Sequence, residues 1–329
     1  MKPVFSVIIA AQDRTKYIVE AINSVRTQSI DPKFYEIIMV TNFPFDIEDV
    51  NIKRFTCTEE GAGAKLAVGI ENAEGKIIAP LDDDDLWESH RLERIHALMS
   101  KDQSIVYYHN RSLKIDESGK LIPDRSIRED TNSVVKFTGD SSFRIIRKMQ
   151  SMRVDWNSSS IVFKKDILAE NLELLKSIER SPESLFFYSS LLPDATIAVD
   201  FASLTEYRIH AKNTSTLKTV ITLDKNIIAE NFRHHLNDGK LIEKKANEEC
   251  ESVAPKLKAA MRNNLDDMMH LHLLEDSKDP KTIGRYMGMY LRIVMPALSF
   301  YDIVLLTLGF ISLINHAIAR AIYLSKFRL

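Results

Sequence analysis

The sequence predicts an α/β fold with a mostly parallel central sheet, followed by a helical C-terminal extension. In the first third of the chain, short apolar runs alternate with segments of helical periodicity. These runs are apolar on both faces, which is typical of strands in a parallel sheet covered by helices on both sides. Beyond Thr216 the strand signal disappears and Leu, Lys, Glu, Asn and Ala dominate.

The first elements alternate in the order expected of βαβ units. The predicted strands are Phe5–Ala10, Tyr35–Val40, Ile52–Phe55, Ile77–Leu81 and Ile105–His109. The predicted helices are Lys16–Thr27, Gly61–Glu71 and a segment marked by Leu92, Ile95 and Met99. Apolar residues at helical spacing identify the helices, and β-branched runs identify the strands.

The pattern changes after Leu113. The stretch LKIDESGKLI reads as a hairpin that turns at Glu117–Lys120. Two further strands are predicted at Asn157–Lys164 and Thr196–Phe201. Asp224–Glu275 is then expected to form two or more surface-facing helices, with an interruption at Pro255.

Bulk properties indicate an ordinary globular protein. With 329 residues, 45% hydrophobic and 27% charged, the chain is long enough for one large α/β domain and an appendage. The formal net charge of −2 gives no general attraction to nucleic acid. Cys57 and Cys250 have no metal-type spacing and are expected to be free thiols in a reducing compartment. The N-terminal apolar run is too short for a secretory signal, which favours a cytoplasmic protein.

Four consecutive aspartates, Asp82–Asp85, follow the predicted strand Ile77–Leu81. Ligands of open α/β sheets bind outside the carboxyl ends of the strands. Like charges there are costly to bury, and a divalent cation shared with an anionic ligand relieves that cost. Alternate side chains of an extended chain share one side, so we expect Asp82 and Asp84 to face the ligand together. Alternatively, the loop caps the helix near Glu88, with Asp85 as the capping residue.

Three segments resemble the family 2 glycosyltransferases of the GT-A fold. They are FSVIIAAQDRTKYIVEAINSVRTQS, GAGAKLAVGIENAEGKIIAPLDDDDLW and YRIHAKNTS, and the hairpin IDESGKLI also fits. The resemblance covers about residues 4–216. It implies transfer of a sugar from a nucleotide-diphosphate donor to an acceptor hydroxyl, with inversion at the anomeric carbon.

The resemblance also assigns roles to the acidic cluster. Asp82 and Asp84 occupy the DXD positions, so Asp84 is expected to bind Mn²⁺ or Mg²⁺ directly. Asp82 is expected to contact the ribose or sugar through the metal shell, and Asp83 to lie beside the donor. His210 matches a histidine that completes the metal site or binds the diphosphate. A structural histidine is the alternative for His210.

The same resemblance places the nucleotide near the first two strands. Ala10, Ala11 and Asp13 correspond to the nucleotide-binding loop, although the usual Pro-Thr-Tyr is missing. Asn42 stands where the family has an aspartate. Arg14 is either part of this loop's site or a solvated surface charge. For Lys65 the two interpretations are a phosphate contact and an ordinary lysine on a helix surface.

An inverting transfer needs a general base for the acceptor proton. Glu183 matches the glutamate of the family's acidic pair, whereas Ser184 replaces its aspartate. Glu183 also suits the start of a helix, where it would favour the positive dipole end. Asp155 and Asp194 are the alternative bases. Trp156 is expected either to line the acceptor pocket or to be a core tryptophan.

The C-terminal region carries a separate signal. Ser299–Asp302 has the pattern of a capping box, and the apolar run Ile303–Ile314 that follows is shorter than the roughly twenty residues a membrane span needs. Basic residues flank it on both sides. We expect peripheral or monotopic attachment at the cytoplasmic face of the membrane. A single tilted span and a homo-oligomer interface are the alternatives.

The expected organisation is therefore a catalytic domain at 1–216, a helical extension at 217–284 and a hydrophobic tail at 285–329. Its expected partners are a nucleotide-diphosphate sugar and a glycan or lipid-linked acceptor. Two other functions are weighed. A GT-A-like scaffold that binds sugar nucleotide with little or no turnover is compatible with Asn42 and Ser184. An aspartyl phosphohydrolase is disfavoured by Leu86, and by the βα structure that precedes the acidic motif instead of following it.

Overall fold

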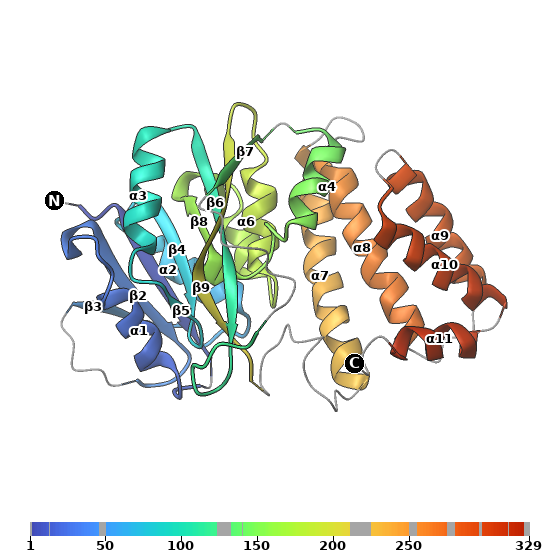
Figure 1. The fold of residues 1–329 in the computed structure, drawn as a ribbon, viewed down its shortest axis with the longest axis horizontal. Helices are drawn as coiled ribbons and strands as arrows, with labels where there is room; N and C mark the ends of the chain where they lie inside the picture. Colours follow the sequence, from blue (N-terminus) through green and yellow to red (C-terminus); the bar gives the residue numbers. More distant parts are fainter. Residues whose placement is uncertain are drawn as a thin grey trace. The chain divides into compact units, whose positions relative to one another are not determined.

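The computed structural model divides into two compact units (Figure 1). Unit 1 consists of Met1–Ser141 and Met149–His210, and unit 2 of Ser142–Lys148 and Ala211–Leu329. The structure describes residues 2–12, 14–45, 51–123, 133–139, 141–210, 225–249, 255–274, 280–295, 298–314 and 316–325.

Unit 1 is built on a nine-stranded sheet in the order β3-β2-β1-β4-β8-β6-β9-β5, with β7 paired to β9. The strands are β1 Phe5–Ala11, β2 Tyr35–Thr41, β3 Ile52–Thr56, β4 Ile77–Asp82, β5 Leu86–Trp87, β6 Ile105–Ile115, β7 Val134–Thr138, β8 Ile161–Lys164 and β9 Thr196–Arg208. Strands β1 to β4 pair in parallel, as do β6 and β9. Strand β8 is antiparallel to both β4 and β6. The mostly parallel α/β sheet predicted from the sequence is confirmed.

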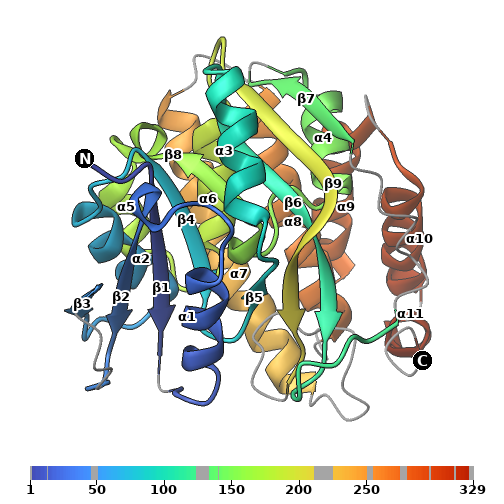
Figure 2. The same ribbon diagram turned by 60° about the vertical axis from the view of Figure 1, so that its left-hand side comes forward.

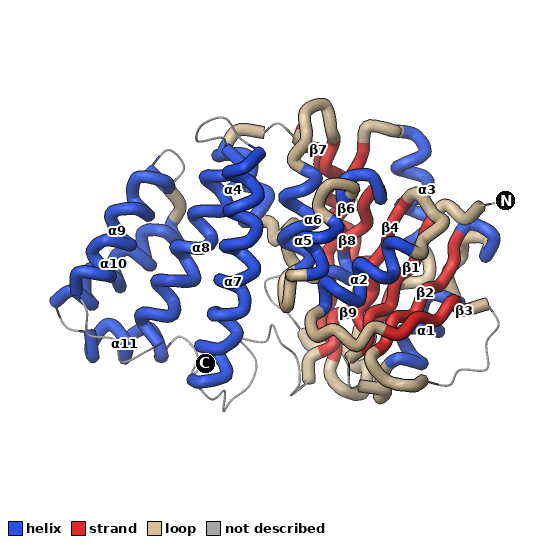
Figure 3. The backbone as a smooth tube through the Cα atoms, turned by 180° about the vertical axis from the view of Figure 1, so that it is seen from behind, coloured by secondary structure: helices blue, strands red, loops and turns tan. Residues whose placement is uncertain are grey.

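Helices cover both faces of this sheet. Their bounds are α1 Ile18–Arg26, α2 Ala62–Glu71, α3 Arg91–Lys101, α5 Leu172–Lys176 and α6 Pro182–Ser190. Helices α1 and α3 lie in front of the strands in Figure 2, and α2, α5 and α6 lie on the opposite face (Figure 3). Val7 and Ile9 of β1 join the core beneath α1 and α3, whereas Ile8 packs against Gly69 of α2. This alternation explains why β1 is apolar at every position.

The structure corrects some predicted boundaries. Ser158–Ser160 forms a turn of 3₁₀ helix, so the strand predicted from Asn157 begins only at Ile161. Strands β6 and β9 are longer than expected, and β7 was not predicted. The hairpin turn after β6 is confirmed by the bridge between Ile115 and Leu121.

Unit 2 is helical in the part that the structure describes. Its helices are α7 Lys225–Glu249, α8 Pro255–Leu274, α9 Pro280–Val294, α10 Phe300–Ile314 and α11 His316–Ser325, and most of α4, Phe143–Ser151, belongs to it. The predicted capping box at α10 is confirmed, because the Ser299 amide donates to Asp302 Oδ2 at 2.8 Å. The Asp302 amide returns a bond to Ser299 Oγ at 3.3 Å. Among the described residues, no helix is long and apolar enough to cross a membrane.

Candidate active site

Strand register brings the predicted site residues to one edge of the sheet. Ala10 of β1 lies beside Asp82 of β4, and Ala11 lies beside Thr41 of β2. Asn42 follows Thr41 directly, so it belongs to the same edge. This is the carboxyl edge of the parallel strands, where the sequence predicted a ligand site. Asp13 lies outside the described residues.

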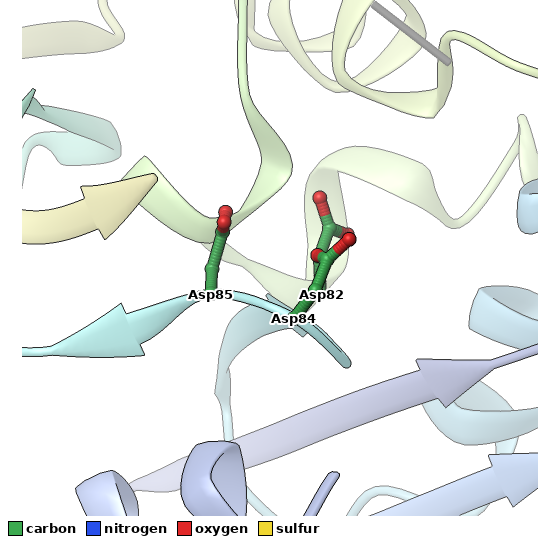
Figure 4. A group of neighbouring side chains, drawn as sticks. All are labelled: Asp82, Asp84 and Asp85. Carbon is green, nitrogen blue, oxygen red and sulfur yellow. The ribbon is translucent and has the colours of Figure 1, made fainter. Parts of the chain in front are cut away.

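The acidic cluster occupies the end of β4. Carboxylate oxygens of Asp82, Asp84 and Asp85 lie within 4.8 Å of one another, and their side chains project to the same side of the chain (Figure 4). Asp84 and Asp85 are buried, whereas Asp82 is half-buried. Asp85 Oδ2 is buried without a hydrogen-bond partner among the described residues. The lone pairs of such an oxygen are available to coordinate a cation.

The turn Ser158–Ser160 supports this cluster from the neighbouring strand β8. Ser159 Oγ accepts a hydrogen bond from the Asp82 amide at 3.0 Å. The carbonyl of Ser159 accepts the indole N–H of Trp87 at 2.8 Å. The chain is thus fixed on both sides of the four aspartates. Both Ser159 contacts depend on the 3₁₀ turn Ser158–Ser160, which stands where the sequence predicted the start of strand β8.

Arg14 supplies the principal positive charge next to the cluster. Its guanidinium contacts the carboxylate of Asp83, and its Nη1 lies 2.8 Å from Asp84 Oδ2. Burial opposes the charge of Arg14, but Asp84 and Asp83 outweigh this and raise its pKa. Arg14 therefore belongs to the site, and the interpretation as a solvated surface charge was wrong.

His210 is also brought to the cluster. Its Nε2 lies 2.8 Å from Asp84 Oδ2, and 3.4 Å from Arg14 Nη1. His210 follows the end of β9, which lies on the same sheet as β4. The ring also packs beside that of Tyr17, with the ring centroids 5.5 Å apart. Asp84 Oδ2 is therefore contacted by two basic side chains.

Arg208 is a site residue that the sequence analysis missed. It is fully buried, and its amide donates to Asp85 Oδ1 at 2.9 Å. Its Nε donates to the carbonyl of Asp84 at 2.8 Å. Asp85 thus binds the end of β9 and does not cap helix α3, contrary to the alternative considered above. The available sequence signal was an arginine two residues before His210, at the end of a strand.

Burial makes the cluster electrostatically costly. The pKa of Asp82 and that of Asp83 are each raised to about 7, first by burial and next by the charge of Asp84. The pKa of Asp85 is raised well above its ordinary value for the same reasons. Hard divalent cations prefer carboxylate oxygens, and this cluster includes one, Asp85 Oδ2, that accepts no hydrogen bond from the described residues. The residues present therefore fit Mn²⁺ or Mg²⁺.

Lys65 is buried, with 1% of its surface exposed, so the alternative of an ordinary surface lysine was wrong. Its Nζ donates to Gln12 Oε1 at 3.1 Å and to the carbonyl of Glu59 at 2.9 Å. Gln12 directly follows β1. Lys65 thus joins helix α2 to the chain that leaves β1 at the site edge.

Glu183 and the acidic cluster are connected through two adjacent serines. Ser158 Oγ donates to Glu183 Oε2 at 3.4 Å, while Ser159 binds the Asp82 amide. Glu183 lies in the first turn of α6, as the sequence predicted.

The two alternative bases differ in position. Asp155 lies three residues before Ser158 and accepts a hydrogen bond from Gln150 Nε2 at 3.2 Å. Asp194 precedes β9, whereas His210 follows its other end, so Asp194 belongs to the opposite edge of the sheet. The structure brings Asp155 near the site and leaves Asp194 away from it.

Trp156 is half-buried and held by neighbours on several sides. Its ring meets that of Tyr207 edge-on at 5.1 Å, and the Arg153 guanidinium lies 4.6 Å from its centroid. His109 Nε2 donates to its backbone carbonyl at 3.1 Å. A partly exposed, fixed indole is able to offer a flat apolar surface to a sugar ring.

Comparison with known proteins identifies the type of domain. Residues 6–166 match the family model described as glycosyl transferase family 2. The chain contains a family 2 glycosyltransferase domain. An uncharacterized glycosyltransferase of Rickettsia conorii is 35% identical over 126 residues, which cover 36% of this chain and 20% of that protein. One from Nostoc is 30% identical over 152 residues, covering 41% and 46% of the two chains.

This chain thus spans about a fifth of the length of the Rickettsia conorii relative that it matches. The family 2 match favours a glycosyltransferase over the aspartyl phosphohydrolase considered above. A solved structure, S. aureus TarS 1-349 in complex with UDP-GlcNAc, has a similar fold with a TM-score of 0.62 and 16% identity. The alignment covers 99% of this chain and 92% of that one. The GT-A fold expected from the sequence is confirmed.

Proposed function

We propose that the protein transfers a sugar from a nucleotide-diphosphate donor to an acceptor hydroxyl, with inversion, and holds the diphosphate through a divalent cation. The observation that carries this proposal is the triad Asp82, Asp84 and Asp85, whose carboxylate oxygens lie within 4.8 Å at the carboxyl end of β4. TarS, which shares the fold, is described in complex with UDP-GlcNAc, and this supports a sugar nucleotide as donor.

The residues proposed to hold Mn²⁺ or Mg²⁺ are Asp84 and Asp82, with His210 beside them. When bound, such an ion supplies Lewis-acid stabilisation of the negative charge on the departing diphosphate. His210 contributes by fixing the Asp84 carboxylate from the β9 side at 2.8 Å. Asp83 lies beside the donor and keeps Arg14 next to the cluster through their ion pair.

The nucleotide is proposed to lie along the ends of β1 and β2. There the backbone of Ala10 and Ala11 and the side chain of Asn42 provide hydrogen-bonding groups, and Asp13 belongs to the same loop. Lys65 orders this loop by binding Gln12, which directly follows β1. A phosphate contact of Lys65 itself would require it to leave three oxygen acceptors, those of Gln12, Glu59 and Gly61.

Glu183 is proposed to accept the proton of the acceptor hydroxyl as the new glycosidic bond forms. Glu183 accepts a hydrogen bond from Ser158, and the adjacent Ser159 binds the Asp82 amide. This proximity to the acidic cluster favours Glu183 over Asp194. Trp156 is proposed to stack on the acceptor, which would be a glycan or a lipid-linked sugar.

A second candidate is a scaffold that binds sugar nucleotide with little or no turnover. Ser184 favours it, because a hydroxyl replaces the carboxylate that the family carries next to Glu183. Turnover separates the two functions. The transferase should slowly hydrolyse its donor even without an acceptor, whereas the scaffold should bind the donor and leave it intact.

Thermal stabilisation tests the proposal directly. UDP, GDP, ADP, CDP and dTDP are each added with and without Mn²⁺, and the unfolding temperature is measured. We expect one diphosphate to stabilise the protein only when Mn²⁺ is present. Asp84→Asn should abolish this effect, while Asp166→Asn, an exposed aspartate outside the site, should keep it. Stabilisation by none of the five nucleotides would overturn the proposal.

A further inference from the structure

Helix α10 presents an apolar face to the outside of unit 2. The exposed Thr307 lies within this face, and its hydroxyl donates to the carbonyl of Ile303 at 2.8 Å. The residues of this face, called the docking face below, are Phe300, Ile303, Val304, Phe310 and Ile314. Their spacing of three, four or seven residues puts them on one side of the helix. The two ends are the most open, with Phe300 81% exposed and Ile314 76% exposed. Isolated exposed apolar residues are common, but a stripe along a whole helix marks an interaction surface.

The opposite side of α10 is fixed in the unit. Leu305 and Leu308 are buried there, and α10 packs against α8, α9 and α11. Asp302 is fully buried and accepts hydrogen bonds from Tyr290 of α9 at 2.6 Å and Arg262 of α8 at 3.0 Å. Rotating the docking face inward would break these bonds and expose Leu305 and Leu308. The apolar stripe therefore stays on the surface.

The charged residues in the sequence around α10 are mostly basic. The half-buried Asp266 of α8 accepts a hydrogen bond from Tyr301 of α10 at 3.2 Å, and Arg262 pairs with it at 3.6 Å. Between residues 280 and 329 the basic residues are Lys281, Arg285, Arg292, Arg320, Lys326 and Arg328, and the only acidic residue is the buried Asp302. Arg285 and Arg292 are exposed on α9, the helix that packs beside α10. Exposed Met289 and Leu291 accompany them on α9. This combination of apolar side chains and arginines suits a binding surface that has both an apolar layer and negative charges.

We propose that the docking face of α10, with the basic side of α9, attaches the protein to an anionic lipid bilayer. The helix would lie in the plane of the interface, with its apolar side chains among the acyl chains and Arg285 and Arg292 at the phosphates. A span is not needed, and none of the described helices is long and apolar enough to form one. A second copy fits less well, because a symmetric contact would bring like-charged arginines together.

The attachment is independent of sugar transfer, since it uses unit 2 and no residue of the candidate active site. If the proposed function also holds, attachment would keep the enzyme where lipid-linked acceptors are found. The two ideas can fail separately, because nucleotide binding and lipid binding are measured by different assays.

Vesicle binding by the full chain tests the proposal. The protein is sedimented with vesicles of phosphatidylcholine alone and with vesicles enriched in phosphatidylglycerol. We expect binding to the anionic vesicles and its release by high salt. The triple variant Phe300→Ser, Phe310→Ser, Ile314→Ser should bind the anionic vesicles roughly tenfold more weakly. A matched triple variant on unit 1, Val19→Ser, Leu121→Ser, Leu192→Ser, should bind like wild type, although it removes apolar residues that are also exposed.

Charge is tested in the same assay. The double variant Arg285→Gln, Arg292→Gln should lose affinity for the anionic vesicles, whereas Lys2→Gln, Lys101→Gln on unit 1 should not. Each variant's unfolding temperature and its Mn²⁺-dependent stabilisation by nucleotide should equal those of wild type. Absence of binding to anionic vesicles, or equal binding by wild type and the docking-face variant, would overturn the proposal. A dimer in solution that the docking-face variant loses would assign the face to a second copy instead, and would also overturn it.

Discussion

His210 Nε2 lies 2.8 Å from Asp84 Oδ2, although the two residues are 126 positions apart in the sequence. The contact joins the end of β4 to the end of β9 and places an imidazole against the acidic cluster. Arg14 approaches the same oxygen from the β1 side, with its Nη1 at 2.8 Å. Asp84 is thus the carboxylate on which three separate parts of the sequence converge, and it is the best candidate for the principal cation ligand.

Replacement of His210 should weaken cation binding. Residues that orient or supplement a metal ligand typically contribute about ten- to a hundredfold to metal affinity. We therefore expect His210→Ala to lower the affinity for Mn²⁺, measured by titration in the presence of the stabilising nucleotide, at least tenfold. His90→Ala, which changes an exposed histidine outside the cluster, serves as the control. Equal Mn²⁺ affinity in wild type and His210→Ala would show that the imidazole has only a packing role.

Replacement of Arg14 should lower the stability of the metal-free protein and increase the stabilisation that the cation provides. Arg14→Gln removes the guanidinium that pairs with Asp83 and Asp84, so we expect a loss of about 1–2 kcal/mol of stability in the absence of metal. Mn²⁺ no longer competes with a resident positive charge, so the rise in unfolding temperature that it causes should be larger than in wild type. Arg26→Gln, on the exposed side of α1, should change neither value. A smaller Mn²⁺ effect in Arg14→Gln would contradict this view.

The sheet and the acidic cluster were predictable because they depend on local patterns. Apolar strands such as Ile77–Leu81 and the aspartates that follow them are neighbours in sequence, and βαβ topology alone sends the ends of β1 and β4 to one edge. Sequence patterns alone therefore suffice to place Asp82 and Asp84 at the carboxyl edge of the sheet.

The surroundings of the cluster could not be predicted, because they depend on contacts between distant segments. Arg14 and Lys65 have the residue types of surface positions, and only the packing of β1 against α2 and β4 shows that they point inward. Arg208 was overlooked because a strand pattern does not reveal which end residue turns toward β4. The turn Ser158–Ser160 falls inside the strand predicted from Asn157, because short polar turns before a strand have no periodicity of their own.

The assignment of the base can be tested by a matched pair of amide variants. Glu183→Gln keeps the hydrogen-bonding shape but cannot accept the proton, so we expect kcat to fall about 10²- to 10⁴-fold. Nucleotide affinity should be unchanged. Asp155→Asn is the comparison, because Asp155 is a second carboxylate near Glu183. Burial is the main cause of the raised pKa of Tyr107, and the negative charges of Asp155 and Glu183 both add to it. A large loss of kcat in Asp155→Asn with near-normal turnover in Glu183→Gln would transfer the role of base to Asp155.

Acid should destabilise the protein through His109. Burial lowers the pKa of His109 from its ordinary 6.5 to about 4, and its Nε2–H is bound to the carbonyl of Trp156. The unfolded chain therefore takes up this proton first as the pH falls. The stability that the neutral imidazole contributes is complete above pH 6.5 and is lost progressively between pH 6.5 and pH 4. At 1.36 kcal/mol per pH unit, the loss is about 2 kcal/mol by pH 5.

The measurement must separate this effect from that of the acidic cluster, which has the opposite sign. Asp82 and Asp83, with pKa values of about 7, bind protons more readily in the folded protein, so their contribution to stability rises as the pH falls from 7 to 4. Urea unfolding of wild type and His109→Gln at pH 7.5 and pH 5 isolates the histidine, because the cluster is common to both proteins. We expect the stability advantage of wild type over His109→Gln to shrink by about 2 kcal/mol between the two pH values. The variant His90→Gln, at an exposed histidine, should follow the wild-type pH dependence. A constant difference between wild type and His109→Gln would mean that His109 does not titrate in this range on unfolding.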